Sequence, residues 1–356
     1  MKNYLCDIIV LTWNQKDVIK SFVESFLENT QTSCRLIIIA NGCSDGTPEY
    51  LGGLQDTPNC TFKILVNKEN NGFVGAMNQG IAVADAPYVC LANNDLLFTR
   101  GWLEEIISVF ESNQKIGLLN PNSNNLGLQP VEGESIQSVA EKLRQEKRGY
   151  FIEMPFCIGF CMFIRREVIE KIGALAQEFY PAFFEDTDYS LRAQRAGFLI
   201  GTASGAYVWH KEHGHFNQAG KRGREVLFTK SRETFIRKWG KTLRIAWIVK
   251  DYQEVFDNLK AGIDLARQAN FITFYVEDTA INREDIFKAQ GAFEHSGVQF
   301  KSYRSYANLI WGIMVKKKKF DLVICKEQPL SRIFRMLGCR AAGYPDNALI
   351  AKIKKL

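Results

Sequence analysis

The chain has 356 residues and a formal net charge of +6, and this length is sufficient for two domains. Its hydrophobic content of 46% and aromatic content of 12% exclude a disordered chain. The charge is modest for this length, so it fits an anionic substrate and gives no indication of a nucleic acid partner.

The sequence predicts neither secretion nor a membrane-spanning helix. It begins directly with a strand pattern, and no run of about eighteen apolar residues is free of charge. The cysteines are odd in number and scattered, and Cys157 and Cys161 lie in an apolar run that is typical of buried small side chains. We therefore expect a cytoplasmic protein, with peripheral contact at the inner face of a membrane left open.

Strand and helix patterns alternate through the first hundred residues. Continuous apolar runs predict buried strands, and helical spacing predicts a helix over residues 16–28. The predicted strands are residues 6–13, 35–40, 62–66 and 88–92. This alternation predicts a mostly parallel, Rossmann-like sheet flanked by helices.

Polar and glycine residues gather where these predicted strands end. They occupy residues 12–14, 41–47, 70–78 and 93–95. Ligands of such sheets bind outside the carboxyl ends of the strands. The sequence therefore predicts a nucleotide pocket at this edge of the sheet.

The patterns farther along the chain predict a loop and an exposed helix over 121–150, then a strand and a helix within 156–173. A short strand over 201–208 and a basic helix over 226–239 follow. A new strand–helix alternation begins at residue 243 and ends with one final helix. We expect two domains, residues 1–240 and a smaller α/β domain of residues 241–356. The lysine run 316–319 fits either a solvated helix end or a contact with anionic lipid headgroups.

Carboxylates follow two of the predicted elements. Asp95, after the strand 88–92, is a suitable ligand for the divalent metal that a leaving diphosphate requires, although Asn-Asn-Asp is also common in turns. Glu185, Asp186 and Asp188 lie within four residues. Close like charges raise one another's pKa, which suits a general base, while the same residues would also cap a helix.

A histidine group follows the strand 201–208. His210 could complete a metal site with Asp95, whereas His213 and His215 fit a surface loop. The glycines at positions 72 and 75 do not form a G-x-G-x-x-G pattern, which argues against NAD.

Eight segments in this order resemble the bacterial family-2 glycosyltransferases, which have the GT-A fold and an inverting mechanism. The segments are LTWNQKDVIKSFVESFLENT, IIIANGCSDGTPEYL, NNGFVGAMNQGI, LANNDLLFTRGWLEEI, IGLLNPNSN, IGFCMFIRREVIEKIG, FFEDTDYSLRAQRAGF and AYVWH. The resemblance covers residues 5–240.

The resemblance implies a role for each matching residue. Donor-binding residues would be Thr12, Asn14, Asn41, Asp45, Gly72, Asn78 and Asn94. Asp95 and His210 would hold Mn²⁺ or Mg²⁺, and Asp186, with Glu185 beside it, would be the catalytic base. The donor would be a nucleotide sugar carrying a hexose or deoxyhexose. The acceptor would be a hydroxyl of a glycan, a lipid-linked molecule or a protein, and oligomerisation stays open.

Two positions depart from the family pattern. Ala40 replaces an aspartate that helps to bind the nucleotide base in many members, and Asn93 replaces the first acid of the D-x-D element. These departures leave open a catalytically silent nucleotide-sugar-binding or scaffolding module. A nucleotidyltransferase is the third alternative, but LTWNQKDV is not the glycine- and arginine-rich loop that it would require.

Overall fold

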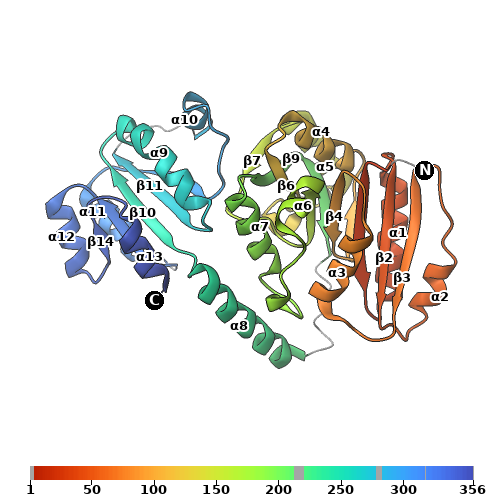
Figure 1. The fold of residues 1–356 in the computed structure, drawn as a ribbon. Helices are drawn as coiled ribbons and strands as arrows, with labels where there is room; N and C mark the ends of the chain where they lie inside the picture. Colours follow the sequence, from red (N-terminus) through yellow and green to blue (C-terminus); the bar gives the residue numbers. More distant parts are fainter. Residues whose placement is uncertain (1–3, 212–219, 278–282, 317, 356) are drawn as a thin grey trace. The chain divides into compact units, whose positions relative to one another are not determined.

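The computed structural model describes residues 4–211, 220–277, 283–316 and 318–355, and Figure 1 draws its fold. The chain forms two compact units. The first unit consists of Met1–Phe151 and Cys157–Thr234, and the second of Ile152–Phe156 and Phe235–Leu356.

One mixed sheet forms the centre of the first unit. Its strands are β1 (Cys6–Thr12), β2 (Cys34–Asn41), β3 (Cys60–Asn67), β4 (Tyr88–Ala92), β5 (Leu96–Phe98), β6 (Ile116–Asn122), β7 (Phe151–Glu153), β8 (Cys161–Arg165) and β9 (Leu199–His210). The order along its main path is β3-β2-β1-β4-β8-β6-β9-β5. Strands β3, β2, β1 and β4 are parallel, β8 is antiparallel to both of its neighbours, and β5 is antiparallel to β9.

Helices flank this sheet, as Figure 1 shows. They are α1 (Lys16–Asn29), α2 (Thr47–Gly52), α3 (Gly72–Val83), α4 (Trp102–Ser112), α5 (Ile136–Lys147), α6 (Arg166–Ile172) and α7 (Glu185–Arg195), with short 3₁₀ turns η1 (Asn124–Leu126) and η2 (Gln177–Phe179). Helix α8 (Gly220–Trp239) follows, and its residues are divided between the two units. Helix α1 buries Ile19, Phe22 and Phe26, which recur at helical spacing. The rings of Phe22 and Phe26 both contact Phe98 of β5 edge-on. The predicted parallel α/β architecture is confirmed.

Some observed elements differ from those predicted from the sequence. Strand β9 is longer than the predicted 201–208, because pairing with β6 and β5 keeps it extended to His210. Helix α8 begins at Gly220 rather than at residue 226. The short strands β5, β6 and β7 were not predicted.

The second unit contains a parallel sheet of its own. Its strands are β10 (Arg244–Val249), β11 (Phe271–Glu277), β12 (Val298–Tyr303), β13 (Leu322–Cys325) and β14 (Ala341–Ala342), in the order β12-β11-β10-β13-β14. Its helices are α9 (Tyr252–Ala266), α10 (Arg283–Ala289), α11 (Tyr306–Met314), α12 (Gln328–Met336) and α13 (Asn347–Lys355). The prediction of a single final helix is therefore wrong, because β14 separates α12 from α13.

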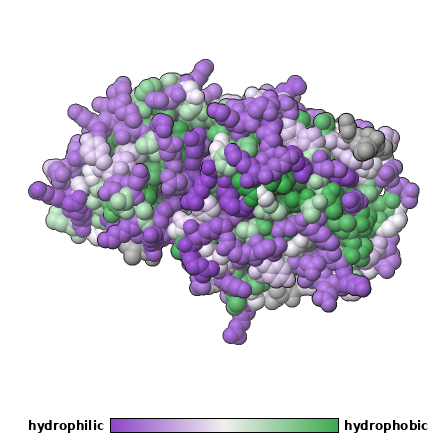
Figure 2. All heavy atoms as spheres, viewed as in Figure 1, coloured by the Kyte–Doolittle hydropathy of each residue, from purple (hydrophilic) through white to green (hydrophobic). Residues whose placement is uncertain are grey.

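The surface of the described residues is mainly hydrophilic on the face that Figure 2 shows, with hydrophobic residues exposed in patches. Within residues 4–211, 220–277, 283–316 and 318–355, no helix combines the length and the apolar character that crossing a membrane requires.

A buried ion pair joins the first two strands of the chain. Asp7 of β1 is fully buried, and its carboxylate accepts hydrogen bonds from Arg35 Nε at 2.8 Å and Nη2 at 2.9 Å. The same carboxylate accepts from the main-chain nitrogens of Asp85 and Ala86 at 2.7 and 2.9 Å. Removing it would leave several buried donors without a partner.

We predict that Asp7→Ala lowers the free energy of unfolding by about 3 kcal/mol, because Arg35 then loses its buried counter-charge. The matched control is Asp85→Ala, which removes the exposed partner of the same arginine; its side chain is 77% exposed. Its effect should stay within about 1 kcal/mol. Urea unfolding measures both values, and equal losses in the two variants would contradict the prediction.

Candidate functional site

The end of β9 lies beside the residue that follows β4. Strand β5 pairs antiparallel with β9 so that Leu96 is opposite His210. This register places Nε2 of His210 3.0 Å from Oδ1 of Asp95. The Asp95 side chain is 2% exposed and the His210 side chain 13%. Two candidate metal ligands that are distant in the sequence are thus brought together.

The geometry of this pair fits a divalent cation. Two ligands about 2.1 Å from Mg²⁺ in adjacent octahedral positions lie about 3.0 Å apart. Carboxylate oxygen and imidazole nitrogen both suit Mn²⁺, and carboxylate oxygen suits Mg²⁺. Among the described residues, no three His, Cys, Asp or Glu side chains form a cluster that could hold a metal ion. The described part of the chain therefore offers Asp95 and His210 as candidate ligands here, and water and phosphate oxygens could supply others.

Neighbouring side chains orient the imidazole of His210. Asn124 bonds both the main-chain nitrogen and the main-chain oxygen of His210, at 2.7 and 2.8 Å. The Phe160 ring stacks on the imidazole with centroids 5.6 Å apart. The Asn125 amide nitrogen lies 3.0 Å from Nδ1, and the Asn125 Oδ1 is buried without a hydrogen-bond partner. Rotating this amide would let its oxygen accept from Nδ1–H, which leaves Nε2 as a metal ligand.

Helix α7 presents the second group of candidate residues. Phe183 and Phe184, directly before it, have φ values of 76° and 67°. Bulky side chains rarely adopt this left-handed conformation, and such strain concentrates at functional sites. Within the helix, Oδ2 of Asp186 accepts from the Gly159 nitrogen at 2.8 Å, and Oδ1 accepts from the Thr187 nitrogen at 2.6 Å. Hydrogen bonds thus hold the Asp186 carboxylate in one orientation.

The segment Gly159–Phe160 connects the two groups. Its Gly159 nitrogen bonds Asp186, and its Phe160 oxygen accepts from the main-chain nitrogen of Asn93 at 2.8 Å. The ring of Phe160 contacts His210. The structure therefore joins Asp95, His210 and Asp186 into one candidate site. This segment lies within IGFCMFIRREVIEKIG, in which no site residue was predicted.

Burial changes the acidity of two carboxyl groups in α7. Burial, with a further contribution from the charge of Asp186, raises the pKa of Glu185 from 4.5 to about 8. Burial also raises the pKa of Asp186, against hydrogen bonds from Gly159 and Thr187 that lower it. A raised pKa brings a carboxylate closer to the range in which a general base is effective.

Asp188 does not have the capping role that the sequence left open. It is fully buried, and its carboxylate binds Nε of Arg192 at 2.8 Å. Phe184 precedes α7 and makes no side-chain capping bond. Asp188 therefore pairs with Arg192 one turn later in the same helix. Arg192 in turn donates to the main-chain oxygens of Ile172 and Ala174, which holds α7 against the end of α6.

Four predicted donor-binding residues lie at the carboxyl ends of β1 and β2. The fully buried Thr12 ends β1, and Asn14 accepts through Oδ1 from the Ser44 nitrogen at 2.7 Å. Asn41 is also fully buried and bonds the Asn70 side chain at 2.9 Å. Burial disfavours the charged form of Asp45, but hydrogen bonds from Thr47 and Lys16 outweigh it and lower its pKa. These residues form a polar network at the carboxyl ends of the strands, where the sequence predicts a nucleotide pocket.

The other predicted donor-binding residues have specific partners. Gly72 has a φ of +64°, and a Cβ atom there would lie 2.8 Å from Cβ of Pro181. The Asn78 amide bonds both the nitrogen and the oxygen of Leu175, at 2.9 and 2.8 Å. Asn94 is fully buried and donates to Thr12 Oγ1 at 3.2 Å and Gln15 Oε1 at 3.1 Å, while its own Oδ1 is buried without a partner. His213 and His215 lie outside the described residues.

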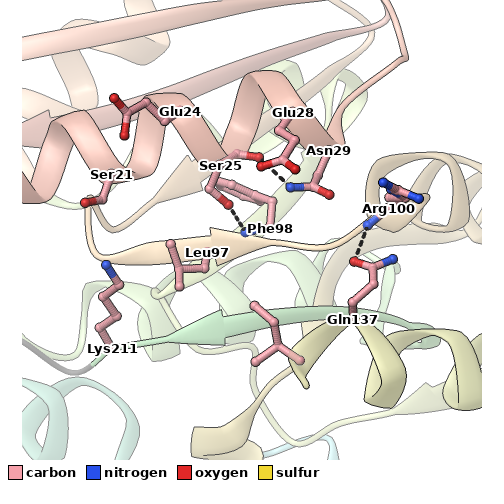
Figure 3. Close-up of a pocket in the computed structure, with 11 residues that line it drawn as sticks. Ser21, Glu24, Ser25, Glu28, Asn29, Leu97, Phe98, Arg100, Gln137 and Lys211 are labelled. Carbon is pink, nitrogen blue, oxygen red and sulfur yellow. Dashed lines mark hydrogen bonds between the residues drawn. The ribbon is translucent and has the colours of Figure 1, made fainter. Parts of the chain in front are cut away.

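A pocket of about 550 Å³ lies between α1, β5 and the start of α5. Figure 3 shows Lys211 and Arg100 at the two ends of β5, with Ser25 and Glu28 of α1 above the strand. Lys211 directly follows His210, and its main-chain nitrogen donates to the Asp95 oxygen at 3.0 Å. The pocket therefore adjoins the Asp95–His210 pair, although no predicted site residue lines it.

The first part of the chain is similar in sequence to known glycosyltransferases. Residues 7–173 match the model of the family described as Glycosyl transferase family 2. A segment of 112 residues is 27% identical to an uncharacterized glycosyltransferase of Haemophilus influenzae, covering 32% of this chain and 34% of that protein. A segment of 114 residues is 27% identical to the poly-beta-1,6-N-acetyl-D-glucosamine synthase of Staphylococcus aureus, covering 32% and 27%. The chain thus spans about a third or less of the length of these two relatives.

A solved structure has a similar fold. It is the mannosyltransferase from Pyrobaculum calidifontis in complex with GDP-Man and Mn²⁺, with a TM-score of 0.50 and 16% sequence identity. The match covers 66% of this chain and 65% of that one. The predicted GT-A fold of the first unit is confirmed.

We predict that Glu185→Gln flattens the pH dependence of stability. The folded protein binds a proton at Glu185 up to a pKa of about 8. The unfolded chain loses that proton near pH 4.5, so stability falls as pH rises between these values. Over this range the wild type should lose up to about 5 kcal/mol more than the variant, because one unit of pKa shift corresponds to about 1.4 kcal/mol. Urea unfolding at a series of pH values tests this, and parallel curves for the two proteins would exclude a raised pKa.

Proposed function

We propose that the chain transfers a sugar from a nucleotide-sugar donor to a hydroxyl acceptor. The premise of this proposal is that residues 7–173 match the model of glycosyltransferase family 2. The observation that carries this proposal is the 3.0 Å approach of Asp95 Oδ1 and His210 Nε2. The segment Gly159–Phe160 connects this pair to Asp186. Asp186 and His210 lie beyond the residues that the family model matches.

Asp95 and His210 would hold a divalent cation, Mn²⁺ or Mg²⁺, which neutralises the departing diphosphate when it is bound. Support comes from the spacing of the two ligand atoms and from the mannosyltransferase crystallised with GDP-Man and Mn²⁺. The contacts of Asn124, Asn125 and Phe160 keep the imidazole in one orientation, so the ligand geometry is formed before the donor arrives.

Asp186 is our proposed general base. Its carboxylate would take the proton of the acceptor hydroxyl while that oxygen bonds to the anomeric carbon and the bond from this carbon to the diphosphate breaks. Attack opposite to the leaving group inverts the anomeric centre. Two hydrogen bonds hold the carboxylate in position, and its raised pKa strengthens it as a base. Glu185 would stay protonated and therefore neutral up to about pH 8, so the negative charge of this pair would lie on Asp186.

The donor would lie along the carboxyl ends of β1, β2 and β3, near the network that includes Thr12, Asn14, Asn41 and Asp45. Ala40, which is fully buried opposite Thr12, offers no carboxylate to the nucleotide base. We therefore leave the base open and propose a hexose or deoxyhexose as the sugar. We propose the hydroxyl of a glycan, a lipid-linked molecule or a protein as the acceptor. The synthase of Staphylococcus aureus supports a glycan.

The cysteines support a cytoplasmic location as part of this proposal. All nine are free thiols, which a reducing compartment maintains. Oligomerisation remains a proposal without a specific contact to support it.

Two alternatives differ from this proposal in their measurable consequences. A silent nucleotide-sugar-binding or scaffolding module would bind a donor without turnover, and Asn93 in place of an acid motivates it. A nucleotidyltransferase would release diphosphate from a nucleoside triphosphate. The convergence of Asp95, His210 and Asp186 favours the transferase.

We predict that Asp95→Asn and Asp186→Asn separate donor binding from catalysis. A panel of nucleotide sugars, titrated with and without Mn²⁺ or Mg²⁺, should identify one donor whose binding depends on metal. Asp95→Asn should weaken that binding by at least about tenfold, because it removes the charged ligand. Asp186→Asn should keep the binding and lower the rate of donor hydrolysis or transfer by about 10²–10⁴.

Asp85→Ala, which removes an exposed carboxylate, is the control for the measurements of donor binding and of the rate of hydrolysis or transfer. Donor binding without any turnover in the wild type would favour the silent module. No donor binding with metal present would contradict the proposed function itself.

A further inference from the structure

The C-terminal part of the chain is strongly basic. Residues 301–356 contain thirteen Lys and Arg but only three Asp and Glu, a net charge of +10. The whole chain has +6, so residues 1–300 carry a net charge of −4. A charge asymmetry of this size indicates an anionic partner for the basic part.

Large apolar side chains are exposed within this basic part. On α11, Leu309 and Ile313 are buried against the sheet, while Trp311 is 72% exposed and Val315 54%. Trp311 and Val315 are four residues apart, so they share one face of the helix. At the end of α12, Met336 is 79% exposed and Leu337 43%. Exposed apolar side chains that lie together indicate an interaction surface.

The exposed residues at the end of α11 and at the end of α12 belong to one surface. Leu309 and Ile313 of α11 and Leu330 and Phe334 of α12 share a core cluster on the same side of the second sheet. Sγ of Cys339, which follows α12, lies 3.7 Å from Sδ of Met314. We call this surface the basic apolar face. It consists of Trp311, Val315, Met336 and Leu337 together with the exposed Lys318, Lys319, Arg332 and Arg335.

Lys316 extends the cationic group at the end of α11. Its ammonium lies 4.5 Å from the centroid of the Phe320 ring. Burial, together with the charges of Lys301 and Arg244, lowers the pKa of Lys316. The partly buried ammonium of Lys316 thus packs on an aromatic ring beside the exposed Lys318 and Lys319.

We propose that the basic apolar face binds the surface of an anionic phospholipid bilayer. Trp311, Val315, Met336 and Leu337 insert among the headgroups and the upper acyl chains. Lys318, Lys319 and the arginines of α12 bind the lipid phosphates. Of the two interpretations of the lysine run 316–319, this proposal chooses the contact with anionic lipid headgroups. It does not depend on the proposed transferase activity.

The composition of the face favours a bilayer over nucleic acid. A protein surface that binds single-stranded nucleic acid uses cations and aromatic rings that stack on the bases. The aliphatic side chains of Val315, Met336 and Leu337 cannot stack, whereas insertion into a bilayer removes them from water. Each cation near an anionic bilayer strengthens binding about fivefold, so several cations beside exposed apolar groups provide the two signals that stable peripheral binding requires.

The experiment is sedimentation of the full chain with vesicles of phosphatidylcholine, with and without phosphatidylglycerol, at physiological salt. The wild type should bind the vesicles that contain phosphatidylglycerol and release them as salt is raised. Lys318→Gln combined with Lys319→Gln should weaken binding about 25-fold, and Trp311→Ser about tenfold. All three side chains are exposed, and circular dichroism verifies that the variants fold.

Matched controls change the same chemistry on the first unit. Lys142→Gln combined with Arg148→Gln removes two exposed cations, and Val131→Ser removes a side chain that is 70% exposed. Neither should alter vesicle binding. The proposal is overturned if the wild type does not bind anionic vesicles, if neutral vesicles bind equally, or if Trp311→Ser has no effect. Tighter binding to a DNA duplex, lost in the lysine variant, would assign the face to nucleic acid instead.

Discussion

The pairing of β5 with the last residues of β9 determines where the candidate site lies. It places a nearly buried carboxylate, Asp95, 3.0 Å from the imidazole of His210. A buried carboxylate is costly unless it accepts hydrogen bonds or binds a cation, and His210 is placed to satisfy it directly or together with a metal ion. Phe160, stacked on the imidazole, and Gly159, bonded to Asp186, then fix the position of the proposed base. This short segment therefore contacts both the proposed metal ligands and the proposed base.

Much of the first unit could be predicted from the sequence, because its parallel strands are continuous apolar runs. Strand β4, Tyr88–Ala92, has the predicted bounds. Strand β5 has only three residues, and β6 contains Asn120 and Pro121, so neither has a strand periodicity. The antiparallel direction of β8 is set by its neighbours, which a local pattern does not reveal. The division of the last predicted helix by β14 could not be predicted either, because β14 has two residues and is defined by its pairing with β13.

For the site, the sequence indicated which residue types gather at the strand ends but not what they contact. The types are predictable because buried parallel strands are mostly apolar, so polar side chains concentrate where the strands end. The contacts are not, because they join segments that are distant in the sequence. Asn94 turns inward to Thr12 and Gln15, and Asn78 is held by the main chain of Leu175. Asn125, which faces His210, lies in a stretch of several asparagines that carries no distinguishing signal.

The central claim is that Asp95 and His210 together bind a cation that carries the donor's diphosphate. Anomalous diffraction from crystals grown with Mn²⁺ and a nucleoside diphosphate tests this most directly. The account predicts one strong peak about 2.1 Å from both Oδ1 of Asp95 and Nε2 of His210, with phosphate oxygens completing its coordination. A peak bound by other residues, or bound nucleotide without any peak at this pair, would contradict it.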